Sequence, residues 1–576
     1  MNQKLENILN VSLDATEDEL RKADSLSTGY NWRDNTWEII VKYSGSLESI
    51  RNRYNVYIKE LLNYYAIIVA DKATIELISQ EDVIDYVEKP KSLYYQIERT
   101  KTAACVGSVR ADGNILSGKG VIVGVIDTGI DIFDNAFRNS DGTTRILNIY
   151  DQTTGEKYDK QSIDEYIRLN EDLSGGTFSY DNAPGVDNIM HGTDVSYIAA
   201  GSLGVAYEAD IIAVKMGYSI NNQFPRTTSL MDAIDYIIRK AIEYRKPVAV
   251  NISYGCNYGA HNGNTLLESF IDDISKSYRC VICVGSGNEA DKAIHFGGII
   301  NTGQVQTAYL SVGEYQSAID IQIWKNYWDT IDVMLINPRG EQIGIITEGR
   351  INRYETYNTE IITLLGEPSP YNIYQEIYIN LIPKTDYILS GIWQIVLMAG
   401  SIRAGEYNIW LPSSQALGYA TAFNNPTADG TITIPATARN CIAVGAYNAY
   451  TNSYAAFSGR GFDNSIRNVN AGVKPDITAP GVDISIARQR GNDITYRNVT
   501  GTSYAVPVVT GAAALLMQWG IVMGNDRFMY GEKLKAALIG GSKPVGLVGI
   551  TRNDNQPDPR TGWGAVCLKN TLNKIL

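Results

Sequence analysis

Strand-like and helix-like hydrophobic patterns alternate over the first ninety residues. Strands are predicted at residues 36–45, at 56–71 (two strands joined by a tight bend) and at 82–89, with helices at 46–55 and 72–80. The resulting order, β-α-β-β-α-β, is typical of a small ferredoxin-like module with a split sheet. Pro90 ends this module, and residues 91–104 (KSLYYQIERTKTAA) have the pattern of an extended linker.

From Gly118 onward the predicted strands become almost continuously apolar. These runs lie at residues 118–131, 209–216, 247–255 and 279–288. Between them, residues 229–245 carry apolar side chains at helical spacing. Apolar strands that alternate with amphipathic helices indicate an α/β domain, in which a parallel sheet is covered by helices on both faces. In such sheets the functional groups gather at the carboxyl ends of the strands.

Residues 296–425 break this rhythm, because apolar and polar residues alternate there between Gly, Pro and Asn turns. This pattern predicts an antiparallel all-β insert, either a sandwich or a jelly roll. Residues 431–448 return to the pattern of the α/β domain. The most apolar later run, 508–524, contains Thr510 and Gln518 and has fewer than 18 uninterrupted apolar residues, so it predicts a buried helix and not a membrane span.

The predicted domain organisation follows these changes of pattern. It consists of an N-terminal domain at 1–96, a first part of the α/β domain at 97–295, the β insert at 296–425 and a second part of the α/β domain at 426–576. A chain of 576 residues is long enough for two to four domains.

The amino-acid composition limits the cellular compartment and the classes of binding partner that are expected. The chain is 44% hydrophobic and 20% charged with a net charge of −13 and no block of Lys and Arg, so neither nucleic acid nor an anionic membrane is an expected partner. The first 32 residues lack the apolar core of a signal peptide, which predicts cytoplasmic synthesis. The six cysteines are scattered. Cys280 and Cys283 form a C-x-x-C motif inside an apolar strand, with no second Cys or His pair to make a metal site.

Three stretches contain candidate catalytic residues. Asp127 ends an apolar strand, His191 opens the stretch HGTDVSYIAAG, and Ser503 lies in a Gly-Thr turn before a helix. A serine at a helix N-terminus lies near backbone N–H groups that can stabilise a developing oxyanion. Taken singly, each residue has a structural explanation: a turn cap for the aspartate, a hydrogen-bonded core imidazole for the histidine, and a helix cap for the serine. An aspartic protease would need a second D-T-G or D-S-G motif, and the chain has none.

Together these blocks resemble the subtilisin-like serine proteases, whose triad follows the chain order Asp, His, Ser. Further blocks in the family's order are NISYG at 251–255, GSGN at 285–288, FSGRG at 457–461 and KPDITAPG at 474–481. The resemblance implies a subtilisin-like α/β core in which Ser503 is the nucleophile, His191 is its general base, and Asp127 orients the imidazole. It also implies that Asn288 and the Ser503 backbone N–H bind the oxyanion. The residues it implies for substrate binding are Ser253, Tyr254, Gly255, Gly285, Ser286 and Gly287.

A closer resemblance is to the Csp germination proteases of spore-forming clostridia. The stretches LSTGYNWRDNTWEIIVKYSG and GNEADKAIHFGG are similar to the start of their pro-domains and to the entry to their jelly-roll insert. This resemblance implies an N-terminal pro-domain that acts as intramolecular chaperone and inhibitor and is cut once between residues 95 and 104; whether it then stays bound or dissociates is left open by the sequence. The expected processing region is Tyr95, Gln96 and Ile97. It also implies a spore-associated protease that activates a germination pro-enzyme; the alternative is a catalytically silent, Csp-like pseudoprotease that serves as scaffold or germinant sensor.

Two positions depart from the family pattern. Asp194 stands where a second histidine is usual, and Tyr504 follows the nucleophile where methionine is usual. Asp194 is expected on the helix surface or as a buried hydrogen-bonding residue. His261 is expected to face solvent, and His295 to pack at the mouth of the insert. The implied partners are a protein or peptide substrate and the chain's own pro-domain. No cofactor is required for catalysis, and structural Ca²⁺ fits the family, but no loop of oxygen ligands can be located in the sequence.

Overall fold

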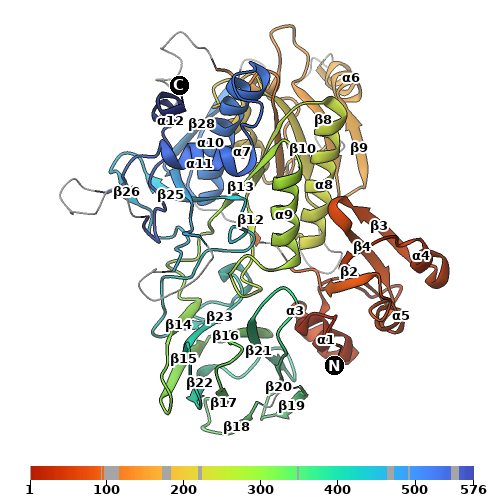
Figure 1. Cartoon of the computed structure of the whole chain (residues 1–576), viewed down its shortest axis with the longest axis vertical. Coiled ribbons are helices and arrows are strands. Elements are labelled where there is room, and N and C mark those ends of the chain that lie inside the picture. Colours follow the sequence, from red (N-terminus) through yellow and green to blue (C-terminus); the bar gives the residue numbers. More distant parts are fainter. Residues whose placement is uncertain are drawn as a thin grey trace.

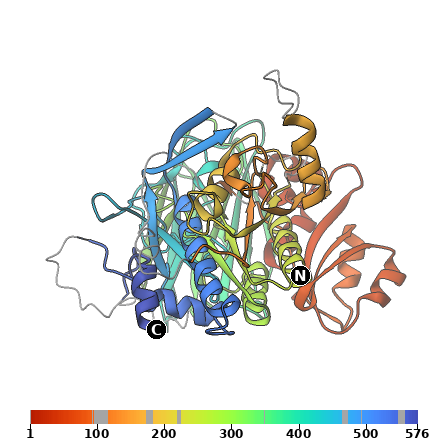
Figure 2. The same ribbon diagram turned by 90° about the horizontal axis from the view of Figure 1, so that it is seen from above.

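Three bodies make up the molecule (Figure 1). The computed structural model describes residues 2–92, 94–95, 116–171, 183–217, 224–346, 349–462, 472–490, 493–546 and 557–575. The N-terminal module, drawn in red, lies beside an α/β core, and the green β insert lies beneath both. Seen from above, the module stands at one side of the core (Figure 2).

The N-terminal module contains the predicted β-α-β-β-α-β order. Its elements are β2 (Thr36–Tyr43), α4 (Glu48–Tyr54), β3 (Tyr57–Leu61), β4 (Tyr65–Ala70), α5 (Lys72–Ile78) and β5 (Ile84–Glu88). The antiparallel sheet has the order β5-β2-β4-β3, and β1 (Tyr30–Asn31) pairs with the start of β2. The predicted ferredoxin-like module is therefore confirmed. Three short helices precede it that the sequence patterns did not predict: α1 (Asn7–Asp14), α2 (Glu17–Lys22) and α3 (Asp24–Ser27).

The core is the predicted parallel sheet. Its strand order is β26-β25-β13-β11-β7-β10-β8-β9, and β27 also pairs with β25. The strands are β7 (Ile122–Asp127), β8 (Ile146–Asp151), β9 (Glu156–Asp159), β10 (Asp210–Lys215), β11 (Val248–Ile252), β13 (Cys280–Gly285), β25 (Ile442–Asn448), β26 (Ser453–Tyr454) and β27 (Ile477–Val482). All neighbours pair in parallel except β9 and β26, which are short antiparallel edge strands.

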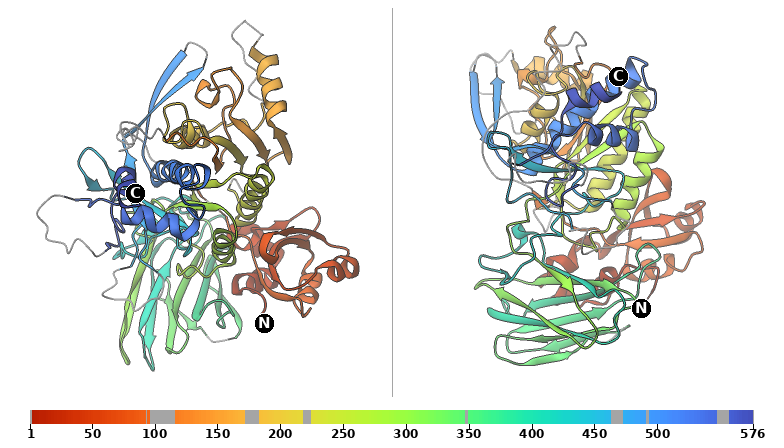
Figure 3. Two further views of the ribbon diagram at one scale, coloured as in Figure 1. Left: turned by 45° about the horizontal axis from the view of Figure 1, so that its top comes forward. Right: turned by 60° about the vertical axis from the view of Figure 1, so that its left-hand side comes forward.

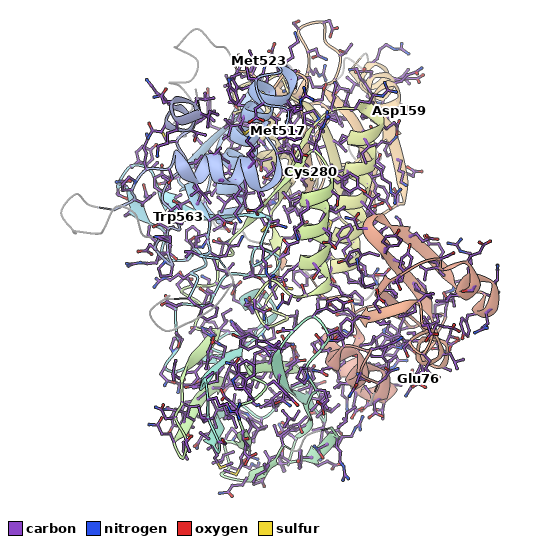
Figure 4. The ribbon with its side chains drawn as sticks, in the orientation of Figure 1. Glu76, Asp159, Cys280, Met517, Met523 and Trp563 are labelled. Carbon is purple, nitrogen blue, oxygen red and sulfur yellow. The ribbon has the colours of Figure 1, made fainter. Side chains whose placement is uncertain are left out.

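Helices cover both faces of this sheet. Two hydrophobic clusters divide alternate residues of β7: Val123 and Val125 pack with α7 (His191–Ala200) and α10 (Thr502–Met517), whereas Ile122 and Ile126 pack with α8 (Thr227–Tyr244) and α9 (Leu266–Ser277). Side chains that alternate between faces produce this division. Cys280 on β13 and Met517 at the end of α10 lie inside the core (Figure 4). Further α-helices among the described residues of the core are α6 (Lys160–Glu171), α11 (Gly531–Gly540) and α12 (Leu568–Ile575).

Within the residues that the structure describes, one segment is apolar and long enough, by composition and length alone, to cross a membrane: helix α10 together with a following π-helical turn (Gln518–Val522). In this structure 89% of its most apolar window is buried. The helix lies between α7 and the strands β11, β13, β25 and β27. It is therefore the central helix of the core, as the polar residues within it predicted.

The insert is a sandwich of two antiparallel sheets, as predicted. One sheet has the order β14-β23-β16-β21-β20-β19 and the other β18-β17-β22-β15-β24. The strands are β14 (His295–Ile299), β15 (Val305–Val312), β16 (Ile319–Asn326), β17 (Ile331–Ile336), β18 (Gln342–Ile345), β19 (Ile351–Glu355), β20 (Thr359–Leu365), β21 (Tyr374–Pro383), β22 (Gly391–Ala399), β23 (Glu406–Trp410) and β24 (Ala422–Phe423). The inward-facing residues of both sheets form one shared core.

The N-terminal module is anchored on both other bodies. Its sheet packs on α8 and α9, where the Tyr65 and Phe270 rings lie 5.2 Å apart in an edge-to-face arrangement. Its first helices share a hydrophobic cluster with residues of β20 and β21. At the junction, the buried Lys91 ammonium pairs with the carboxylates of Glu6 and Glu88, and Glu88 also accepts a hydrogen bond from the Leu266 backbone N–H of α9 at 2.8 Å.

Candidate active site

The three candidate catalytic residues lie at the carboxyl edge of the central strand and at two helix starts. Asp127 is the last residue of β7, His191 the first of α7 and Ser503 the second of α10. All three are at most 1% exposed. The Nδ1 atom of His191 lies 2.6 Å from Oδ1 of Asp127, and the two helices α7 and α10 pack against each other. Residues that lie far apart in the chain thus meet at one edge of the sheet.

The close approach of α7 to the end of β7 depends on a glycine. A Cβ atom on Gly192 would lie 2.3 Å from the carbonyl oxygen of Gly129 and 2.9 Å from the Cβ of Asp127. The backbone N–H of Gly192 donates to the Thr128 hydroxyl at 2.9 Å. A side chain at position 192 would therefore push the histidine away from the aspartate.

Asp187 accepts hydrogen bonds from groups at the end of β7 and around the start of α7, and the sequence patterns did not single it out. One of its carboxylate oxygens accepts from the Thr128 hydroxyl at 2.7 Å and from the Met190 backbone N–H at 2.7 Å. The other accepts from the backbone N–H and the hydroxyl of Thr193, both at 2.8 Å. An aspartate shortly before a helix start is a capping signal, which could have identified this residue.

The pKa of His191 is raised above its ordinary value of 6.5. Burial is the largest single influence and lowers this pKa, because it disfavours the charged imidazole. The carboxylate of Asp127, by charge and by hydrogen bond, and the charges of Asp194 and Asp187 act in the opposite direction and outweigh it. The site therefore stabilises an imidazolium, the form that a general base adopts after it takes up a proton.

The side-chain amide of Asn288 is buried and lies next to the start of α10. Its Oδ1 accepts from the backbone N–H of Thr502 at 3.0 Å and from the Thr502 hydroxyl at 3.1 Å. Because a backbone N–H can only donate, this contact assigns the oxygen of the amide and turns Nδ2 the other way. Among the described residues Nδ2 has no hydrogen-bond partner, although it is buried. A buried, unsatisfied donor next to the start of α10 is suited to an oxyanion.

Because the resemblance to subtilisin-like proteases implies that Asn288 donates to the oxyanion, its replacement by alanine is expected to lower kcat for peptide hydrolysis by about 10²–10³-fold with little change in KM; such a donor acts only as negative charge develops. Steady-state kinetics on a peptide substrate would measure both constants. Asn262→Ala is a matched control, since Asn262 is also buried and its amide donates to Asn372 at 2.9 Å within the junction with the insert. A rise in KM at constant kcat would show instead that Asn288 only binds substrate.

The expected substrate-binding residues lie at the same edge of the sheet. Tyr254 and Gly255 form β12, which pairs antiparallel with β6 (Tyr94–Tyr95). The Ser253 hydroxyl donates to the carbonyl oxygen of Ser503 at 3.2 Å. Gly285 ends β13, and the Ser286 hydroxyl lies 3.3 Å from that of Ser458.

Gly287 has a φ of +96°, and a Cβ there would lie 2.6 Å from the Thr433 side chain. Position 287 therefore requires glycine. Of the expected processing region, Tyr95 ends β6, whereas Gln96 and Ile97 lie outside the described residues.

The expectation that His261 faces solvent is wrong. His261 is buried, its Nδ1 lies 2.6 Å from the Ile432 carbonyl oxygen, and its ring stacks on Trp410 with the centroids 4.1 Å apart. His295 begins β14, as expected for a residue at the mouth of the insert, and stacks on the same indole at 4.9 Å. The polar sequence around His261 gave no signal of the Trp410 ring, which comes from β23 of the insert.

No cluster of three or more His, Cys, Asp or Glu side chains that could hold a metal ion occurs in the part of the chain that the structure describes. Cys280 and Cys283 are buried in β13 as free thiols. Burial raises the pKa of each to about 12, which disfavours the thiolate needed for metal binding or redox exchange.

Known proteins resemble this chain over most of its length. The family model described as the subtilase family matches residues 118–368 and 404–564, and that described as the Csp protease B prodomain matches residues 3–91. The solved structure of the Clostridium perfringens CspB protease is 34% identical, with a TM-score of 0.74, over 82% of this chain and 96% of that one.

Curated relatives match a shorter segment. Subtilisin E of Bacillus subtilis is 38% identical over 121 residues, 20% of this chain and 28% of that protein. Subtilase-type proteinase RRT12 of Saccharomyces cerevisiae is 33% identical over 128 residues, 22% of this chain and 23% of that protein. The chain thus spans about a quarter of the length of these two relatives. With the family model matched over more than half of its residues, the chain belongs to the subtilase family of serine endopeptidases and carries a Csp-type prodomain ahead of its α/β core.

Proposed function

We propose that this chain hydrolyses peptide bonds with Ser503 as nucleophile, His191 as general base and acid, and Asp127 as the residue that orients the imidazole. The observation that carries this proposal is the buried 2.6 Å contact between His191 Nδ1 and Asp127 Oδ1 beside the start of the helix that bears Ser503. That contact leaves the Nε2 atom of the imidazole as the one that exchanges a proton with substrate and nucleophile.

The proposed reaction has two halves. The Ser503 hydroxyl oxygen attacks the scissile carbonyl while His191 takes its proton. The imidazolium then gives that proton to the leaving amine, which departs and leaves an acyl-enzyme. In the second half a water molecule, deprotonated by His191, attacks the carbonyl carbon of the ester. The bond from that carbon to Ser503 Oγ then breaks, the imidazolium returns the proton to Oγ, and the carboxylic acid product leaves. Asn288 Nδ2 and the Ser503 backbone N–H donate hydrogen bonds to the oxyanion of both tetrahedral intermediates. These steps use no metal or organic cofactor.

We further propose that the chain processes itself just after β6, in the region of Tyr95, Gln96 and Ile97. The pairing of Tyr94 and Tyr95 with Tyr254 and Gly255 supports this, because a protease holds its substrate as an added antiparallel strand. The backbone leading to β6 is anchored as well. The Lys91 carbonyl oxygen accepts from the Thr227 N–H at 2.6 Å, and its own N–H donates to the Thr227 hydroxyl at 2.7 Å.

The prodomain is proposed to stay bound after the cut. Its buried ion pairs and its shared hydrophobic clusters with α8, α9 and the insert do not depend on the covalent link. Arg353 of the insert also pairs with Asp14 at 2.9 Å and Glu19 at 3.0 Å in the prodomain. By its likeness to the Csp germination proteases, the chain is proposed to be spore-associated, with a germination pro-enzyme as its protein substrate.

Labelling with a fluorophosphonate serine probe tests the proposal. The purified chain is expected to take up one probe per molecule, on the tryptic peptide that contains Ser503, and its mass is expected to show one cut between residues 95 and 104. An intact chain that takes up no probe would contradict catalysis and favour the alternative of a silent scaffold. A label on any other serine would contradict the assignment of the nucleophile.

A further inference from the structure

A two-stranded hairpin beside the active site brings two arginines to it. The hairpin consists of β28 (Ile484–Arg490) and β29 (Asp493–Val499) and is the light-blue pair of long strands in Figure 3. Its second strand ends four residues before Ser503. Resting on the function proposed above, we propose that Arg488 and Arg497 are positioning residues, which hold the segments that bear His191 and Ser503 through a shared contact with Asp194.

Arg488 contacts one group before and one group after His191 in the chain: the backbone carbonyl of Met190 and the carboxylate of Asp194. Its Nε donates to Asp194 Oδ1 at 3.0 Å, and one terminal nitrogen donates to the same oxygen. That terminal nitrogen also donates to the Met190 carbonyl oxygen at 2.9 Å. Met190 precedes His191 and has a left-handed φ of 67°, an uncommon conformation for a residue with a side chain. One guanidinium therefore holds the strained residue before the histidine and the carboxylate three residues after it.

Arg497 extends the contact to the segment of the proposed nucleophile. Its terminal nitrogen lies 2.7 Å from Asp194 Oδ2, and its guanidinium also interacts with the Tyr504 hydroxyl. Tyr504 directly follows Ser503, is 1% exposed, and packs edge-on against the His191 ring with the centroids 5.3 Å apart. Both departures from the family pattern, Asp194 and Tyr504, thus belong to one connected set with the hairpin arginines.

The Asp194 carboxylate gains its stability from this pairing. It is completely buried, and burial raises its pKa, while the charges of Arg488 and Arg497 oppose that rise. A buried carboxylate without a partner is strongly destabilised, so the guanidinium groups keep it charged, and either one alone still gives it a partner. Buried ion pairs of this kind add little net stability compared with apolar packing, so the role that the proposal gives to this one is to select a single geometry. The geometry selected here is that of the start of α7.

The pKa of His191 depends on all the charged groups around its ring, including Asp194 and the two hairpin arginines. The carboxylates that face it come from Asp127 at the end of β7, Asp187 in the preceding loop and Asp194 on α7 itself. The Tyr504 phenol approaches from α10. Arg488 and Arg497 pair with Asp194 and offset its charge. Removal of the Asp194 charge should therefore lower the pKa of His191, and removal of either arginine should raise it.

The titration of His191 can be measured directly, because the chain has only three histidines. Full-length protein labelled with ¹³C-histidine would be titrated by NMR, and the His191 signal assigned as the one missing in His191→Gln. Asp194→Asn is expected to lower the pKa of His191 by about one unit, and Arg488→Gln and Arg497→Gln to raise it by a similar amount. The matched control is Arg239→Gln, since Arg239 is a partly exposed arginine paired with the buried Asp235 on α8, and it should leave the titration unchanged.

The inference is overturned if the pKa of His191 in Asp194→Asn and in Arg497→Gln equals that in the control variant. It is also overturned if both substitutions shift this pKa in the same direction. Arg497→Gln carries the test should Arg488→Gln fail to fold, because the Arg497 side chain is 41% exposed at the rim of the site. Kinetics give a second readout. The acid limb of kcat/KM should follow the NMR pKa of each variant, and Arg497→Gln should lower kcat with KM unchanged. Opposite NMR shifts in a protein that hydrolyses no peptide would support the positioning role and reject the proposed function.

Discussion

Ser503→Ala is expected to remain a full-length chain and to hydrolyse peptides about 10⁶-fold more slowly than the unaltered protein, as in other proteases with this triad. Without the hydroxyl no acyl-enzyme can form, and only the oxyanion donors and substrate binding contribute to the residual rate. The fold should persist, because the change removes one oxygen from a fully buried side chain at a helix start. Intact-mass spectrometry would measure processing, and long progress curves would measure the residual hydrolysis.

Ser275→Ala is the matched control for this variant. Ser275 is a buried serine on α9, on the opposite face of the sheet, so its loss should affect neither processing nor rate. If Ser503→Ala were processed in the same way as the unaltered chain, the cut would be made by another protease or another residue. Addition of active protein to Ser503→Ala separates these outcomes further, because a cut made only within one molecule is not restored in trans.

Asp127→Asn is expected to lower kcat by about 10⁴-fold near neutral pH while the fold is retained. An asparagine at this position can donate its amide hydrogen to Nδ1 of His191, which places the imidazole proton on Nε2, the atom that must accept the proton of Ser503. The substitution also removes the carboxylate that does most to raise the pKa of His191. Activity requires neutral His191, so the acid limb of kcat/KM should lie above pH 6.5 in the unaltered protein and move to lower pH in the variant.

The pH profile of kcat/KM for both proteins would check this prediction, with Asp235→Asn as control. Asp235 is also a buried aspartate, but it lies on α8 and pairs with Arg239. An unchanged kcat in Asp127→Asn would exclude Asp127 as the orienting residue. If the acid limb of the kcat/KM profile lay at the same pH in both proteins, the charge of Asp127 would not be what raises the pKa of His191.

Local patterns in the sequence were sufficient for most secondary structure. Runs such as 118–131 and 247–255 are apolar because both faces of their strands are covered, and they formed β7 and β11. The β-α-β-β-α-β order near the N-terminus followed from the change between period 2 and period 3.6. The helices α1 to α3 were not predicted because each is short, and their apolar residues face the β20 and β21 strands of the insert.

The sequence by itself identified Asp127, His191, Ser503 and Asn288 as candidate catalytic residues, because the blocks that contain them resemble those of the subtilisin-like proteases in the same chain order. Only the tertiary structure decided their surroundings. Asp194 and Arg488 are 294 residues apart, and no local period relates them. His261 lies in a polar stretch, yet the Trp410 ring from another domain covers it. Periodicity reports whether a residue faces a core, whereas the partner it meets there depends on how distant elements pack against one another.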